Sequence, residues 1–469
     1  MLYLQSGVFS DRSSFDKMAS IVLSCLVKSV VRPSLMHASS SDASVASLLQ
    51  QCQKALDLPP PSACGPVAVA MSGGVDSSTI AAVLKHLGYT PLGLTLKLYT
   101  PKQTTASQGT CCAGRDIRDA KAVAQRMGFS HYVLDYESQF KKGVIDPFVG
   151  AYAKGETPVP CVLCNQTVKF HDLLKQAQTL GCVALVTGHY VQRIRYGAHT
   201  HLLRGIDETR DQSYFMFATT KEELKMARFP LGGLRKSQTR TLADHFELEV
   251  AQKQESQDIC FVGGGKYTDV LKRLDPHSFK PGDIVDTTGR VLGQHQGIAA
   301  YTVGQRKGLG LSSKAPLFVL KVDAAKNQVV VGPKEGLLCK QLSVQGMNWL
   351  FEPQSTLPLE ISVRLRSTGP FSKARVLLDT HDKAAFVTLD DGQMGIAKGQ
   401  ACVFYQGQRV LGGGWITQAE NVALHTNTHK KWEDLWRTRK SHTHNSVFTK
   451  VQAPLTPNTP LNEHTQPAA

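Results

Sequence analysis

Apolar runs alternate with helical patterns between residues 67 and 187, and this alternation constrains the fold more than any other feature. Each run is short enough to be one strand, and the helical patterns between runs close on Gly88 and Gly128. Strands that alternate with helices form parallel βαβ units, so we expect a doubly wound α/β sheet. The strand-like runs are Val67–Met71, Thr90–Leu98, His131–Leu134 and Val183–Thr187.

The rhythm changes after about residue 280. Short strand-like runs are then separated by Gly, Pro and Asp turns, without intervening helices. This pattern is typical of an all-β, barrel-like structure. The runs are Asp283–Val285, Phe318–Val322, Gln328–Val331, Glu360–Arg366, Ala374–Leu378, Ala385–Leu389 and Ala401–Tyr405.

Both ends of the chain differ in composition from its body. Residues 1–65 are rich in Ser and Ala, so we expect a disordered or targeting extension there. Residues 419–469 hold 5 of the 16 His and lack apolar periodicity, which predicts a disordered His-rich tail. The chain carries a net charge of +15, of which +12 falls within residues 66–417. A basic folded body indicates a polyanionic partner.

Cysteine usage and hydropathy bear on the compartment. The 11 Cys are irregularly spaced and odd in number, which favours a reducing compartment over a secreted disulfide scaffold. No run approaches 18 uninterrupted apolar residues, so we expect no membrane-spanning helix. A cytoplasmic location is preferred, with a mitochondrial or plastid matrix as the alternative. Cys182, Cys339 and Cys402 have apolar neighbours and are predicted to be buried small hydrophobes.

The motif SGGVDSS at Ser72–Ser78 lies between a predicted strand and a predicted helix. Its glycines let backbone N–H groups converge on an anion, and the helix N-terminus adds a positive dipole. The Lys of the GxxxxGK[ST] loop is absent. The motif therefore predicts the pyrophosphate loop of an enzyme that cleaves ATP to AMP and pyrophosphate.

A CxxC pair, Cys161 and Cys164, follows two prolines, and a third cysteine, Cys260, stands far away in a DICF motif. We expect the CxxC in a loop before a helix, where the helix dipole would stabilise a thiolate. Three thiols of this kind are compatible with half a zinc site, with a three-thiolate iron–sulfur site, or with persulfide chemistry. A structural role is the simpler alternative, and for Cys111 and Cys112 it is the preferred one.

Eight motifs in order make residues 66–417 resemble the tRNA-specific 2-thiouridylase family of pyrophosphate-loop enzymes. They are AMSGGVDSS at 70–78, PVPCVLCNQTVKF at 158–170, TGHY at 187–190, RDQSYF at 210–215, SQDICFVG at 256–263, GQHQG at 293–297, TVGQRKGLG at 302–310 and GQACVFYQGQRVLGGG at 399–414. The resemblance implies a Rossmann-like adenine-nucleotide α-hydrolase domain at 66–275, a small central domain at 276–345 and a C-terminal β-barrel at 346–418.

The resemblance also implies a reaction and its residues. ATP, with Mg²⁺, activates the wobble uridine of tRNA, which is extruded from its stack. Cys164 would be the nucleophile, and Cys260 would carry a persulfide received from a cysteine desulfurase or a sulfur-relay protein. A Cys164–Cys260 disulfide would then close the turnover. The implied ATP-binding residues are Ala70, Met71, Ser72, Gly73, Gly74, Val75, Asp76, Ser77, Leu96 and Gly188.

Further residues are implied to contact tRNA, with the Lys, Glu and Gln acceptors as substrates. These are Val159, Pro160, Cys161, His189, Arg210, Asp211, Gln212, Arg366, Ser367 and Gln400. Three cations, Arg204, Arg306 and Lys307, suit phosphate contacts, which position RNA without reading its sequence. A satisfied structural histidine is the rival interpretation of His189, and solvated surface charge that of the three cations.

The chain departs from the family pattern at two positions. Many members have Asp where this chain has Cys161, and with three cysteines present a 4Fe–4S cluster on Cys161, Cys164 and Cys260 becomes an alternative to the persulfide relay. At Ser367 an aromatic residue is common. Two other classes of protein are alternatives: an ATP-dependent ligase with the same loop, and a non-enzymatic RNA- or metal-binding protein. Neither requires the loop and the three cysteines together.

Overall fold

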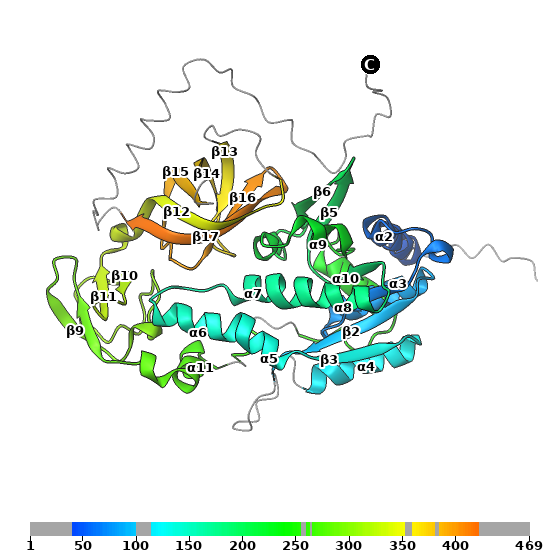
Figure 1. Cartoon of the computed structure of the whole chain (residues 1–469), viewed down its shortest axis with the longest axis horizontal. Coiled ribbons are helices and arrows are strands. Elements are labelled where there is room, and N and C mark those ends of the chain that lie inside the picture. The colour runs from blue at the N-terminus through cyan, green and yellow to red at the C-terminus, as the bar shows by residue number, and fades with distance from the viewer. Residues whose placement is uncertain are drawn as a thin grey trace, which may run out of the picture. The chain divides into compact units, whose positions relative to one another are not determined.

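The computed structural model describes residues 40–99, 114–254, 259–262, 265–351, 359–379 and 384–421 (Figure 1). The expected features before residue 40 and after residue 421, and the pair Cys111 and Cys112, lie outside these residues. The chain divides into two compact units, Met1–Ala46 and Ser47–Ala469, and the description below concerns the second. No helix in the described ranges is both long enough and apolar enough to span a bilayer.

A five-stranded parallel sheet forms the first part of this unit and confirms the predicted α/β class. Its strand order is β3-β2-β1-β4-β7, and all four pairings are parallel. The central strand β1 is apolar and almost wholly buried, as expected when helices cover both faces. The strands are β1 Val67–Ala70, β2 Pro91–Lys97, β3 His131–Asp135, β4 Ala184–Val186 and β7 Ala227–Arg228, and the associated helices include α3 Val75–His86, α4 Gly114–Met127, α9 Lys221–Met226 and α10 Lys236–His245.

A long helical segment contains the CxxC pair, which corrects the expectation of a loop. Pro160 occupies the first turn, where a missing N–H costs nothing, so the prolines start the helix instead of preventing it. The helix becomes π-helical at Cys164, a local widening that is frequent at functional sites. The segments are α7 Pro160–Leu163, π-helical η3 Cys164–Asp172 and α8 Leu173–Thr179, preceded by α5 Glu137–Phe140, π-helical η2 Lys141–Ile145 and α6 Asp146–Ala153.

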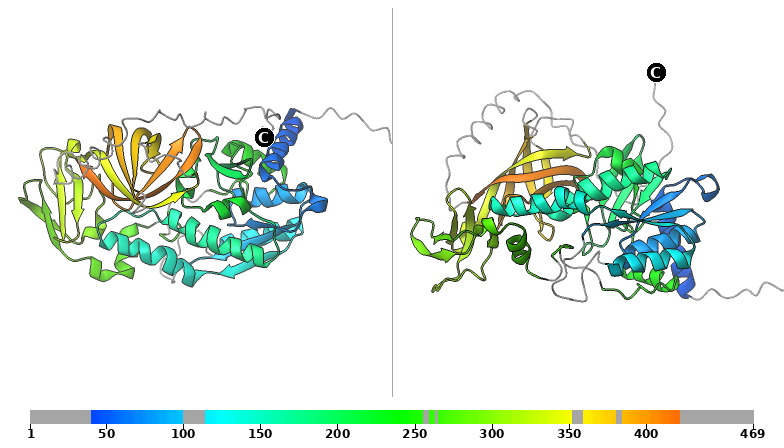
Figure 2. Two further views of the ribbon diagram at one scale, coloured as in Figure 1. Left: turned by 45° about the horizontal axis from the view of Figure 1, so that its top comes forward. Right: turned by 60° about the horizontal axis from the view of Figure 1, so that its bottom comes forward.

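Six antiparallel strands form the predicted C-terminal barrel, which closes because β12 pairs with β17 (Figure 2). The first barrel strand begins at Leu338, so the predicted boundary at residue 346 falls eight residues too late, inside this strand. The last barrel strand runs three residues beyond the predicted boundary at 418. The strands are β12 Leu338–Trp349, β13 Leu359–Arg364, β14 Phe371–Asp379, β15 Ala384–Met394, β16 Ala401–Gln406 and β17 Arg409–Asn421.

In the sequence between these two parts, residues 282–332 form a small four-stranded sheet with its own apolar core. Its order is β10-β11-β8-β9, and Ile284, Val319, Val329 and Val331 are buried together. The strands are β8 Gly282–Val285, β9 Val291–His295, β10 Phe318–Asp323 and β11 Gln328–Gly332, and helix α11 Tyr267–Leu274 precedes them. Short 3-10 turns complete the fold: η1 Pro61–Ala63, η4 Ser213–Met216, η5 Pro276–Ser278, η6 Ile298–Ala300 and η7 Lys334–Leu337.

Part of the expected N-terminal extension is ordered. Residues Ser40–Leu56 form helix α2, and Cys52 and Leu56 on it are fully buried. The following Asp57 pairs with Arg193 at 2.8 Å. Of the two alternatives predicted for residues 1–65, a disordered or a targeting extension, disorder is therefore wrong for residues 40–56.

A hairpin that the sequence did not reveal connects the α/β part to the barrel. Strands β5 Val191–Tyr196 and β6 His199–Arg204 pair with each other, and β6 pairs with barrel strand β17. The nearby RDQSYF motif strengthens this junction: Tyr214 Oη donates to Ala401 O and accepts from Ala401 N, both at 3.1 Å. The hairpin, the RDQSYF motif and the barrel motif at 399–414 therefore form one structural junction.

Removing the Tyr214 hydroxyl should destabilise the protein. Tyr214→Phe leaves the backbone N–H and C=O of Ala401 without their hydroxyl partner in a fully buried place. We expect a loss of about 1–3 kcal/mol in the free energy of unfolding, measured by urea denaturation. Tyr196→Phe is the control, because Tyr196 is 57% exposed. Equal stability of the two variants would contradict the role of this contact.

Candidate nucleotide and cysteine site

The glycine loop lies at the switch point of the parallel sheet. From β1 the chain proceeds to β2 and β3 on one side, whereas β4 and β7 lie on the other side. Ligands of open α/β sheets bind in the crevice at such a point, outside the carboxyl ends of the strands. The loop after β1 and the TGHY segment after β4 meet there, because a Cβ on Gly188 would stand 3.0 Å from the Asp76 Cβ.

The loop conformation depends on glycine and on short internal hydrogen bonds. Gly73 has φ +72°, and a Cβ there would lie 2.1 Å from the backbone oxygen of Asp116. The backbone N–H of Ser72 donates to Ser77 Oγ at 3.1 Å, and this hydroxyl donates to Gly74 O. No side chain caps the N-terminus of α3. An uncapped helix start behind a glycine turn is a site for an anion.

Two side chains that the sequence did not single out hold the loop aspartate. Lys236 Nζ, from the start of α10, lies 2.7 and 2.8 Å from the two carboxylate oxygens of Asp76. Tyr190 Oη donates to the same carboxylate at 2.9 Å. Because Lys236 is 160 residues away from Asp76, no local pattern could have indicated this pair. The Asp76 carboxylate is thus already engaged by a cation.

The two candidate catalytic cysteines belong to one apolar cluster. Cys164 is 6% exposed, and Cys260 is half-buried against the same cluster. Leu96 on β2 packs against this cluster too, and it is one of the residues expected beside the adenine. The structure therefore brings strand β2 and both thiols into one neighbourhood, although they are far apart in sequence.

The expectation of a stabilised thiolate is wrong for the protein alone. Cys164 lies within a helix, not before one, and burial raises the pKa of its thiol. Burial by surrounding protein also raises the pKa of Cys161, although its side chain is exposed. The ammonium of Lys169 opposes both pKa shifts only in part.

Alkylation of Cys161 should be slow at neutral pH and should accelerate with rising pH. Its raised pKa means that the thiolate fraction grows about tenfold per pH unit without levelling off below pH 9. Iodoacetamide labelling followed by peptide mass spectrometry checks this, with Cys64, a half-buried thiol elsewhere, as internal comparison. A rate that levels off near pH 7 would show that the thiolate is already formed.

The three thiols do not fit an iron–sulfur site in this structure. Among the described residues, which include Cys161, Cys164 and Cys260, no three His, Cys, Asp or Glu side chains are grouped so that they could hold a metal ion. Each of the three cysteines is in the reduced, thiol form. The predicted burial of Cys182, Cys339 and Cys402 is confirmed, since their exposures are 5%, 0% and 0%.

Several residues expected to contact tRNA lie inside the protein. The Asp211 side chain is 0% exposed and pairs with Arg204 at 3.4 Å and with Arg364 at 3.3 Å. Gln212 Oε1 accepts from the backbone N–H of Tyr190. Arg204 also lies over the ring of Phe371. In this arrangement Asp211 and Arg204 stabilise the junction with the barrel, and the sequence cannot distinguish such a buried ion pair from an exposed one.

His189 is neutral and partly enclosed. Burial, with a further effect of Lys169, lowers the pKa of His189 to about 3. Its Nδ1 forms a 2.8 Å hydrogen bond with Thr187 Oγ1, and its ring lies against Phe170 and Phe229. The lowered pKa disfavours the imidazolium form of His189 in the protein without bound RNA.

The remaining expected RNA contacts border the CxxC segment and the barrel. Arg366 is exposed and Ser367 half-buried, in the turn after β13. Gln400 Nε2 donates to Thr157 O at 2.9 Å, and Thr157 N donates to Lys398 O at 2.7 Å. The barrel loop thus holds the residues that lead into Val159, Pro160 and Cys161. Arg210 is half-buried, and Arg306 and Lys307 are exposed.

Three family models match almost the whole described body. They are the tRNA methyl transferase HUP domain at residues 65–264, the tRNA methyl transferase PRC-barrel domain at 268–333 and the aminomethyltransferase beta-barrel domain at 339–416. The start of the third match at 339 agrees with the observed start of β12, not with the predicted boundary.

Relatives named tRNA-specific 2-thiouridylase MnmA match over most of the chain. That of Afipia carboxidovorans is 50% identical over 383 residues, covering 80% of this chain and 97% of the relative. That of Rhodopseudomonas palustris is 54% identical, covering 75% and 91%. Among solved structures, the U34-tRNA thiolase NcsA from Methanococcus maripaludis aligns with 50% of this chain and 75% of that one, at a TM-score of 0.32 and 16% identity. From the three domain matches and the identity to these relatives, the chain belongs to the tRNA-specific 2-thiouridylase family.

Proposed function

We propose that this protein uses ATP to replace the 2-oxygen of the wobble uridine of tRNA with sulfur. The observation that supports this most is the placement of Leu96. This residue belongs to the sheet whose switch point holds the glycine loop, and it packs against the cluster that contains Cys164 and Cys260. Activation of the base by the nucleotide and delivery of sulfur can therefore take place in adjoining sites.

In the first step the uridine 2-oxygen attacks the α-phosphorus of ATP, and pyrophosphate leaves. The loop from Ala70 to Ser77 would hold the phosphates, with Leu96 and Gly188 on the adenine side. The uncapped start of α3 supports this assignment, because its N–H groups are donors without a side-chain partner at the cap. Mg²⁺ would arrive with the nucleotide as part of the substrate. The adenylated C2 is then electrophilic, since AMP is a good leaving group.

In the second step the terminal sulfur of a Cys260 persulfide attacks this C2, and AMP leaves. The Cys164 thiolate then attacks the Cys260 sulfur, so that the bond between Cys260 and the transferred sulfur breaks. This yields 2-thiouridine and a Cys164–Cys260 disulfide. Oxidation of the two cysteines to the disulfide supplies the two electrons that reduce the transferred sulfur. An external thiol restores the cysteines. The shared apolar cluster supports this pairing, which needs Cα atoms within about 7 Å.

The RNA would lie across the α/β part and the barrel. The segment from Val159 to Cys161 would border the target base, and Arg210, Arg366, Ser367 and Gln400 would contact the tRNA, with His189 and Gln212 near the base. Asp211 would act through Arg204 and Arg364. We further propose the Lys, Glu and Gln acceptors as substrates, a cysteine desulfurase or relay protein as donor, and a cytoplasmic location. The net charge of +12 over residues 66–417 supports a polyanionic partner.

The proposal is tested by exchange of labelled pyrophosphate into ATP in the presence and absence of tRNA. Exchange should require tRNA, and the RNA should gain a sulfur at the wobble uridine, detected by nucleoside mass spectrometry. Exchange with an amino acid and no tRNA would show a ligase instead. A methylated nucleoside would agree with the names of two of the matching family models, which refer to tRNA methyl transferase, and would contradict thiolation.

The persulfide relay and the iron–sulfur cluster predict different results for Cys161. Many family members have Asp at this position, so a relay enzyme should tolerate Cys161→Asp, whereas a cluster with three thiolate ligands should not. An anaerobic preparation should also be colourless in the visible range if the relay operates. Visible iron–sulfur absorption together with an inactive Cys161→Asp variant would establish the cluster.

A further inference from the structure

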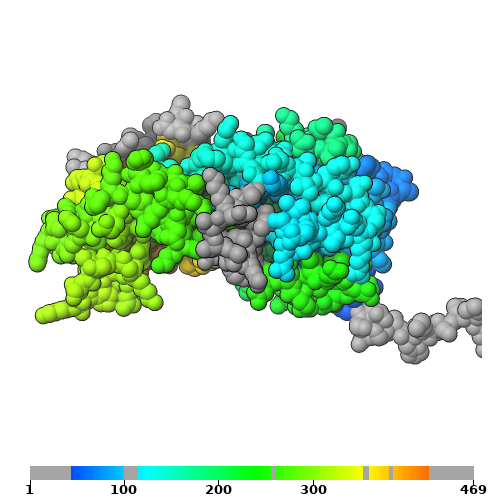
Figure 3. Space-filling view, turned by 90° about the horizontal axis from the view of Figure 1, so that it is seen from below, coloured from blue at the N-terminus to red at the C-terminus, as the bar shows by residue number. Residues whose placement is uncertain are grey.

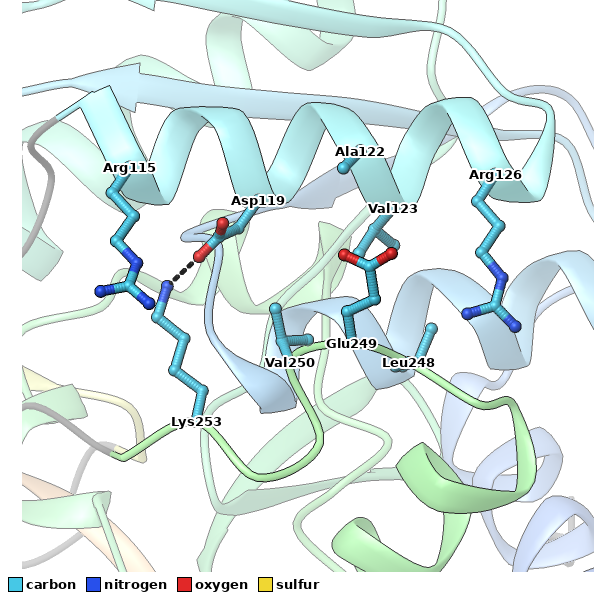
Figure 4. A pocket seen from close by; sticks show the side chains of 9 residues that line it. All are labelled: Arg115, Asp119, Ala122, Val123, Arg126, Leu248, Glu249, Val250 and Lys253. Atoms are coloured by element: carbon cyan, nitrogen blue, oxygen red, sulfur yellow. Dashed lines mark hydrogen bonds and ion pairs between the residues drawn. The ribbon is translucent and has the colours of Figure 1, made fainter.

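Lys253 joins three parts of the chain next to the glycine loop. Its Nζ lies 2.9 Å from the backbone oxygen of Gly73 and 2.7 Å from Asp116 Oδ1, and it also contacts Asp119 (Figure 4). Both carboxylates belong to α4. Lys253 itself lies on the segment that leads to Cys260, seven residues later. On the face seen in Figure 3, the cyan surface around α4 adjoins the green surface of the later helices.

The bond to Gly73 O has a geometric consequence for the next N–H group. A trans peptide is planar, so the carbonyl of Gly73 and the N–H of Gly74 point in opposite directions. Between two glycines such a peptide can turn over at little cost. If it turned, the Gly73 carbonyl oxygen would take the place of the N–H and would repel a phosphate oxygen. A cation that holds the carbonyl on the α4 side prevents this.

The surroundings of Lys253 suit this role. Its side chain is 23% exposed and those of Asp116 and Asp119 are 13% and 27% exposed, so the three groups are largely shielded from water. Although burial opposes it, the hydrogen bonds that Lys253 donates to the two carboxylates raise its pKa, which keeps it a cation throughout the working pH range. The loop also rests on α4 directly, because a Cβ on Gly73 would clash with the Asp116 backbone.

We propose that Lys253 is a positioning residue for pyrophosphate, which holds the Gly73–Gly74 peptide so that its N–H faces the phosphates of bound ATP. This inference rests on the proposed binding of ATP at the loop. It differs from a direct contact, since Lys253 acts through the backbone of the loop. A pocket of about 290 Å³ between α4 and residues 248–253 has Lys253 in its wall, together with Arg115, Asp119 and Glu249.

The test compares three ligands on the full chain by calorimetry. Lys253→Met should weaken the binding of ATP and of inorganic pyrophosphate by about tenfold, which is the effect of one charge-assisted hydrogen bond. Its affinity for AMP should stay within about twofold of the wild-type value. Measurement in high salt separates this from loss of a positive charge, because a long-range charge effect is screened there and a misoriented peptide is not. Lys321→Met is the matched control, since it removes an ion pair with Asp323 in the central sheet.

The outcomes separate the two proposals. If the wild-type protein binds neither ATP nor pyrophosphate, the proposed function fails. If the wild-type protein binds both, the inference about Lys253 is wrong in either of two cases. In the first, Lys253→Met binds ATP and pyrophosphate as tightly as the wild-type protein does. In the second, its affinity for AMP falls as much as its affinity for the other two ligands. Should Lys253→Met not fold, Asp119→Asn serves instead, because it keeps the lysine and removes one of its two charged anchors. We then expect Asp119→Asn to lose affinity for ATP and pyrophosphate but not for AMP, by less than the roughly tenfold expected for Lys253→Met.

Discussion

Cys164→Ser should abolish tRNA thiolation, by at least about a thousandfold, while tRNA-dependent exchange of pyrophosphate into ATP continues. A hydroxyl at this position is a far weaker nucleophile than a thiol and cannot form a disulfide with Cys260. Adenylation of the base does not use the thiol, so exchange is preserved. The measurement pairs exchange with the 2-thiouridine content of the product tRNA.

The same variant should accumulate sulfur on the enzyme. With labelled cysteine and a cysteine desulfurase, the label should remain on Cys260, because the step that releases it is missing. Cys182→Ser is the control: Cys182 is 5% exposed and its role is packing. We expect it to keep full activity. Normal thiolation by Cys164→Ser, or loss of exchange together with thiolation in a folded protein, would remove Cys164 from its proposed role.

Cys260→Ser should also abolish thiolation, but for a different reason. Without this thiol the enzyme cannot accept the donor's sulfur, so no label should appear on the protein. Exchange of pyrophosphate should again continue. The opposite labelling results of the two serine variants distinguish carrier from nucleophile, which activity alone cannot do.

Cys64→Ser provides a matched control for Cys260→Ser, since both residues are half-buried, reduced cysteines in the described structure. Cys64 lies beside η1, where it interacts with Arg228, and is outside the apolar cluster of Cys164. We expect Cys64→Ser to load and transfer sulfur as the wild-type does. Retained thiolation in Cys260→Ser would exclude the persulfide carrier and would favour another sulfur source.

The structure could be predicted wherever its signals are residues close together in the sequence. The glycine loop could be placed because a short apolar run, two glycines and a helical pattern follow one another within about 20 residues. The barrel strands could be located because turn residues bound them. The predicted boundaries were wrong where a residue type is compatible with two structures. The prolines before Cys161 suggested a loop, but Pro160 also fits the first turn of a helix.

By itself, the sequence determined the fold class, the family, the phosphate loop and the identity of the two candidate cysteines, because each depends on residues that are neighbours along the chain. Only the tertiary structure decided that Lys236 holds Asp76, that Lys253 holds the Gly73 carbonyl, and that Asp211 is an internal ion-pair partner. Contacts between side chains more than 130 residues apart leave no periodic trace. Burial, which raises the pKa of Cys164 instead of lowering it, likewise depends on what packs against the helix from elsewhere in the chain.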